Sequence, residues 1–89
     1  MGCPSNPDRI VVYYENRTDS TLSLFVDGRP VGVPGKAVEP GETLSVADVI
    51  SPWQKDRRVT AHDQDGIIRF DRVYSLEDLK TSKYRIVIE

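Results

Sequence analysis

The chain has few of the residues that disulfide frameworks and common metal sites require. Among its 89 residues there is one cysteine and one histidine, which excludes a disulfide framework and the common zinc sites within a single chain. The longest unbroken apolar run, Ile10 to Tyr14, is far too short to span a bilayer. Twelve basic against 14 acidic side chains give a net charge of -2, which argues against nucleic-acid binding through a basic face.

What the chain does have is β-branched residues. Val and Ile number 17 and Thr adds 5, whereas Leu (5) and Ala (3) are scarce. Branching at Cβ suits a pleated strand better than a helix. We therefore predict an all-β domain over residues 9–89, preceded by a flexible tether over residues 1–8 that holds two Pro and almost no apolar surface.

The spacing of apolar runs and turns predicts an antiparallel β-sandwich of about seven short strands. The Asp27-Gly28 pair predicts a tight hairpin, and Glu39-Pro40-Gly41-Glu42 predicts a type II turn. A capping-box pattern, Ser75 to Asp78, predicts one short helical turn before the last strand. The expected strands are 9–16, 21–26, 29–33, 43–49, 57–63, 67–74 and 84–89.

The last hairpin sets the face of several side chains. In either plausible register, one face is expected to hold Val59, Ala61, Ile68 and Phe70. The opposite face is expected to hold Thr60, His62, Arg69 and Asp71. A surface position is the plainer interpretation of His62, because catalysis would need a positioned partner and a nucleophile or activated water.

The arrangement resembles the small immunoglobulin-like or transthyretin-like sandwich modules of bacterial envelope proteins. The residues behind this resemblance are Val26-Asp27-Gly28, Pro40 to Leu44, and Val59 to Gly66. The resemblance is one of architecture over residues 9–89 and carries over no functional residue. It implies an extracytoplasmic binding or spacer role; a cytoplasmic location is the alternative.

Cys3 is the candidate lipidation site. A bacterial lipoprotein, once processed, begins at a lipidated Cys that often follows Gly or Ala and precedes a polar linker, as Cys3 follows Gly2. Acylation of the eukaryotic type at Met1-Gly2-Cys3 is weakened by Asn6, where Ser or Thr is required. An incidental free thiol is the competing interpretation. Any membrane contact would run through that lipid alone.

Trp53, Asp63, Asp65 and Arg69 are the binding candidates. Trp53 suits stacking on a sugar or anchoring a partner, although a lone Trp in a sandwich loop more often caps the core. Asp63-Gln64-Asp65-Gly66 resembles the opening of a calcium loop but is too short and lacks the distant Glu, and a hairpin turn explains it fully. Arg69 belongs to a set of arginines that forms either an anion patch or cross-strand ion pairs.

These observations predict a non-catalytic module that binds a protein partner in the envelope or acts as a spacer. No catalytic residue, metal ligand set or cofactor is assigned, and nucleic acid is excluded as a partner. The surfaces favoured for binding are the edge from Pro30 to Pro34 and the loop at Trp53; a homodimer joined at an edge strand is an alternative. A small-ligand domain for carbohydrate or a divalent cation is the second hypothesis. Asn16-Arg17-Thr18 fits a glycosylation sequon, which applies only in a eukaryotic secretory setting.

Overall fold

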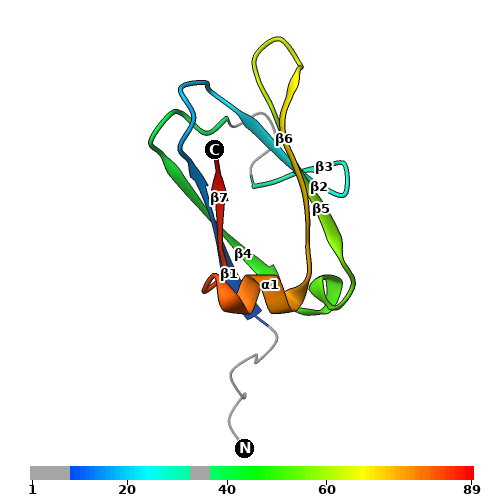
Figure 1. Cartoon of the computed structure of the whole chain (residues 1–89). Coiled ribbons are helices and arrows are strands. Elements are labelled where there is room, and N and C mark those ends of the chain that lie inside the picture. The colour runs from blue at the N-terminus through cyan, green and yellow to red at the C-terminus, as the bar shows by residue number, and fades with distance from the viewer. Residues whose placement is uncertain (1–8, 33–36) are drawn as a thin grey trace, which may run out of the picture.

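The fold is a sandwich of two β-sheets (Figure 1). The computed structural model describes residues 9–32 and 37–89, and within them seven strands and one α-helix are formed. One sheet has the order β4-β1-β7 and the other the order β3-β2-β5-β6. The predicted all-β class and the short helix before the last strand are confirmed. The elements are β1 Arg9–Asn16, β2 Ser23–Val26, β3 Arg29–Pro30, β4 Thr43–Val49, the 3-10 helix η1 Ser51–Gln54, β5 Arg57–His62, β6 Ile68–Tyr74, α1 Leu76–Thr81 and β7 Arg85–Ile88.

Strand β1 lies at the centre of the three-stranded sheet. It pairs antiparallel with β4 on one side and parallel with β7 on the other. The parallel pair departs from the fully antiparallel sandwich predicted. Helix α1 makes it possible, because it carries the chain across one end of the sandwich between β6 and β7 (Figure 1).

The core lies between the sheets and contains alternate residues of each strand. From β1 it takes Val12 and Tyr14, at 0% and 1% exposure. Helix α1 contributes Leu79, which is fully buried, so the single helix is held by its packing on the sheets. The other buried apolar residues are Leu22, Leu24, Val26, Val31, Val38, Trp53, Val59, Ala61, Phe70, Ile86 and Ile88.

Two turns and one helix cap form where the sequence predicts them. Asp27 and Gly28 both have positive φ (52° and 80°), as a tight hairpin requires. Gly41 has φ 79°, and the Glu42 N–H donates to the Glu39 carbonyl at 2.9 Å, which closes the turn around Pro40-Gly41. The capping box is also present: the Asp78 N–H donates to Ser75 Oγ at 3.1 Å, and the Ser75 N–H donates to Asp78 Oδ2 at 2.9 Å.

The β5–β6 hairpin corrects one expected position. Ala61 pairs with Phe70, but His62 pairs with Ile68, so a β-bulge leaves Arg69 without a counterpart. The extra residue reverses the facing of Ile68, which is 53% exposed instead of buried beside Val59 and Ala61. The expectation that Ile68 shares a face with Val59, Ala61 and Phe70 was therefore wrong, because strict alternation holds only where no bulge intervenes.

Candidate binding site at the edge between the two sheets

The loop that carries Trp53 is part of the core. Trp53 lies in η1, has no exposed surface, and donates its indole Nε1–H to Asp48 Oδ2 at 3.1 Å. The Arg57 guanidinium carbon lies 5.0 Å from the centre of the indole ring, a cation–π distance. This is the core-capping alternative of the sequence interpretation. With its faces covered, Trp53 offers no surface on which a sugar ring stacks.

Asp63 and Arg69 form a structural ion pair at the β5–β6 turn. Asp63 Oδ1 accepts the N–H groups of Asp65 and Ile67, both at 2.9 Å, and Oδ2 pairs with Arg69 Nε at 2.7 Å. Arg69 first, and then the Ile67 N–H, hold the pKa of Asp63 below its usual range. Asp65 is exposed at the turn. The Asp63 carboxylate is thus used by the hairpin itself, and no cluster of three metal-ligating side chains is found over residues 9–32 and 37–89.

The outer side of β4 pairs with no other strand among the residues that the structure describes. Asn16 donates its N–H to the Glu42 carbonyl at 3.0 Å, and the register continues as Tyr14↔Leu44 and Val12↔Val46. Because directly opposed pairs in an antiparallel ladder alternate between bonded and non-bonded, the even-numbered residues of β4 bond to β1. Thr43, Ser45 and Ala47 therefore direct their N–H and C=O groups away from the sheet.

Strand β4 differs from each of the other three edge strands in length or in charge. It has seven residues, no Pro and no basic side chain. Edge strand β3 has two residues, one of them Pro30, and edge strand β7 has four and begins with Arg85. Edge strand β6 also has seven residues but carries Arg69, Asp71 and Arg72. The one charge of β4, Asp48, lies on the inward-facing side with Leu44 and Val46, and Asp48 Oδ1 accepts the Val49 N–H at 2.8 Å. The open edge thus runs over Thr43 to Ala47. Natural proteins usually block the row of N–H and C=O groups that such an edge presents.

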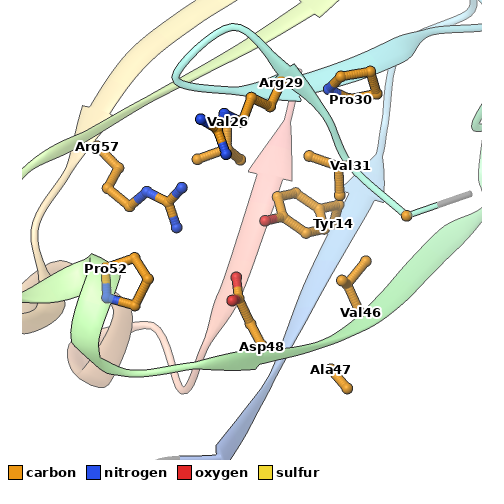
Figure 2. A pocket seen from close by; sticks show the side chains of 11 residues that line it. Tyr14, Val26, Arg29, Pro30, Val31, Val46, Ala47, Asp48, Pro52 and Arg57 are labelled. Carbon is orange, nitrogen blue, oxygen red and sulfur yellow. The ribbon is translucent and has the colours of Figure 1, made fainter. Parts of the chain in front are cut away.

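A cleft of about 250 Å³ opens beside this edge, between β4 of one sheet and β3 of the other. Figure 2 shows the Tyr14 hydroxyl, the Asp48 carboxylate and the Arg57 guanidinium converging on it. The lining is completed by Val26, Arg29, Pro30, Val31, Gly32, Val46, Ala47 and Pro52. Both surfaces favoured from the sequence border this cleft: Pro30 to Gly32 on one side and the loop at Pro52 on the other.

Two of the charged side chains that line the cleft, Asp48 and Arg57, form hydrogen bonds within the domain. Arg57 donates Nε–H to Asp27 Oδ2 at 2.9 Å, and Asp27 Oδ1 accepts the Arg58 N–H at 3.0 Å. The Arg57 hydrogen bond first, and then the Arg58 N–H, hold the pKa of Asp27 below its usual range. Arg29 is exposed and makes no ion pair with the residues that the structure describes. The cleft thus offers a ligand the guanidinium of Arg29 and those N–H groups of Arg57 that do not bond to Asp27.

Tyr14 gives the cleft a pH dependence that can be measured. Burial first, and then the nearby Asp48 charge, raise the pKa of Tyr14 well above its ordinary value of 10.0, with Arg57 opposing. A raised pKa stabilises the fold below pH 10, and that stabilisation is lost as the pH rises above it. We expect Tyr14→Phe to retain its stability further into alkali than the wild type, measured as melting temperature against pH. Parallel loss in the two proteins would contradict this assignment.

Several residues of the site were not assigned from the sequence. Tyr14, Arg29, Val46, Asp48 and Arg57 line the cleft, and none of them was a binding candidate. Asp48 and Arg57 flank the Trp53 loop, the one local signal that links them. Cys3, Val33 and Pro34 lie outside the described residues.

Comparisons with protein-family models, curated proteins and solved structures found no match to this chain. Across the described part of the chain, no helix has the length and apolar content that crossing a membrane requires.

Proposed function

We propose that this chain is a non-catalytic β-sandwich module that binds a protein partner, which adds an extended segment to the open edge of β4. The observation that carries the proposal is the backbone from Thr43 to Ala47, whose outward groups pair with none of the described residues, on a strand without Pro or basic side chains. In strand addition, main-chain hydrogen bonds supply affinity, and pockets for alternate side chains supply specificity. The cleft beside β4 is such a pocket.

The chemistry of the described residues supports binding rather than catalysis. The single histidine, His62, packs against Phe25 with ring centres 4.6 Å apart, on the other sheet from β4. Asp48 accepts hydrogen bonds from Val49 and Trp53, so both of its oxygens are already hydrogen-bonded within the domain. A general base must come within hydrogen-bond reach of the substrate proton that it removes, and a carboxylate with both oxygens engaged is poorly placed for that role.

The proposal extends to an extracytoplasmic location in a bacterial envelope, with a lipid on Cys3. It is supported by the architectural resemblance and by the Gly2-Cys3 pair before a polar tether. The mass of the N-terminal peptide, from protein expressed in its own host with its natural upstream sequence, tests this part. A diacylglycerol on Cys3 supports it, and an unmodified terminus in the soluble fraction contradicts it.

Strand addition is tested by blocking the edge of β4. A photo-crosslinking amino acid at Ser45, in the host cell, is expected to capture a partner that mass spectrometry identifies. With that partner purified, Ala47→Pro is expected to weaken binding at least about tenfold, because it removes one outward N–H and places a ring in the interface. The ladder with β1 is retained, since the Ala47 N–H faces away from it.

Val73 offers a matched control on the other sheet. It is 54% exposed on edge strand β6. The Asp27 N–H donates to the Arg58 carbonyl, so the even residues of β5 bond to β2, and the ladder alternation directs the Val73 N–H to the free side. Val73→Pro should leave binding unchanged, and a crosslinker at Val73 should not capture the same partner. Equal weakening by both proline variants, or capture from Val73 alone, would refute binding at β4.

A further inference from the structure

We propose that the partner segment carries an acidic side chain that enters the cleft and pairs with Arg29. This inference rests on strand addition at β4 and specifies the chemistry of the partner. The register of an added strand, the hydrogen-bonding groups that line the cleft and the position of Arg29 across from β4 support this pairing.

The register of an added strand directs alternate side chains into the cleft. Successive residues of a strand point to opposite faces of the sheet. Leu44, Val46 and Asp48 are partly buried on the inner face, and Val46 and Asp48 line the cleft. A partner residue opposite Val46 with the same inward facing therefore projects between the two sheets. Arg29, on β3, lies on the far side of that opening (Figure 2).

The cleft has a surplus of hydrogen-bond donors. The guanidinium of Arg29 makes no hydrogen bond among the described residues, and Arg57 uses only its Nε–H, toward Asp27. The one carboxylate among the lining residues, Asp48, already receives one hydrogen bond on each oxygen. Unmatched guanidinium donors fit a carboxylate best, because charge-assisted bonds to Arg are bidentate and strong.

The remaining lining describes the rest of the partner segment. Val26, Val31 and Val46 provide apolar walls, and a volume of about 250 Å³ admits one side chain and not a second domain. The outer face of β4 shows Ser45, Ala47 and the 38%-exposed Val49. We therefore expect an extended segment of β-branched residues with a single Glu or Asp at an inward position.

A peptide selection finds such a segment while the cellular partner is still unidentified. A library of random peptides displayed on phage is selected on the immobilised full chain, with Ala47→Pro as the counter-selection. The enriched peptides are synthesised, together with versions in which the acidic residue is replaced by its amide. Binding is measured to wild type, to Arg29→Gln, and to Lys80→Gln, which removes one positive charge from α1.

The expected result is a coupling between the acidic residue and Arg29. Amide replacement should weaken binding to the wild type and to Lys80→Gln about tenfold, the size of one charge-assisted hydrogen bond, and should have no effect on Arg29→Gln. Equal affinity of acid and amide for the wild type would overturn the inference; strand addition would stand if Ala47→Pro still abolished binding. Peptides that bind Ala47→Pro as well as wild type, or no enrichment at all, would overturn strand addition and the inference together.

Discussion

Replacing Trp53 by alanine is expected to unfold the domain or to leave it at the margin of stability. The side chain is the largest in the core and has no exposed surface. Removing such a side chain costs about 3–5 kcal/mol through lost burial and the remaining cavity. Small single domains lie at the lower end of the usual range of stability, about 5–15 kcal/mol, so the loss approaches the whole.

The Trp53→Phe variant separates ring packing from the indole hydrogen bond. Phenylalanine keeps most of the apolar volume but leaves Asp48 Oδ2 without its donor, which costs about 1–2 kcal/mol. Urea denaturation of both variants measures the difference. A Trp53→Ala protein within 1 kcal/mol of wild type, about a quarter of the expected loss, would show that η1 does not cap the core.

Asn16→Asp is the second substitution with a large expected effect. Asn16 is fully buried, and its Nδ2 donates to the carbonyls of Ser20 at 2.8 Å and Val38 at 2.9 Å. Its Oδ1 accepts both the N–H and the hydroxyl of Thr18, at 2.9 and 2.6 Å. Aspartate would turn the amide donor into an oxygen facing two carbonyls. We expect a loss of about 3 kcal/mol.

Arg17→Gln is the local control for Asn16→Asp, because it changes the exposed middle residue of the same sequon, which pairs with Glu15. An exposed ion pair contributes at most about 1 kcal/mol. The melting temperature should therefore fall far less for Arg17→Gln than for Asn16→Asp. Equal shifts would mean that the Asn16 amide does not organise the turn. The same burial keeps the sequon asparagine away from a glycosylating enzyme in the folded domain.

The strands were predictable because local chemistry and tertiary packing agree in them. The β-branched and aromatic run in Arg9–Asn16 and the apolar alternation in Thr43–Val49 both form strands. The Asp27-Gly28 turn and the Ser75 capping box also form where the sequence predicts them. The facing of Ile68 was missed, since a bulge inserts one residue without any local signal in the hairpin. The parallel β1–β7 pair is equally non-local, because it joins the two ends of the domain.

The candidate site was predicted less well than the fold. Trp53 was named as a binding candidate, but its side chain is buried in the core and donates a hydrogen bond to Asp48. The open edge depends on which strands become neighbours, and no local pattern in Thr43–Val49 indicates that, among the described strands, β4 pairs on one side only. Asp63 and Arg69 were singled out by their charges, yet those charges pair with each other at 2.7 Å.

Residue-resolved amide exchange of the isolated monomer tests the central claim, that the outer edge of β4 is open to an added strand. The account predicts alternation along one strand: slow exchange at Leu44 and Val46, whose N–H groups bond to β1, and fast exchange at Ser45 and Ala47. Adding a bound partner segment should then slow Ser45 and Ala47 selectively. If Ser45 and Ala47 in the isolated monomer are as protected as Val46, the edge is already covered and the account is contradicted.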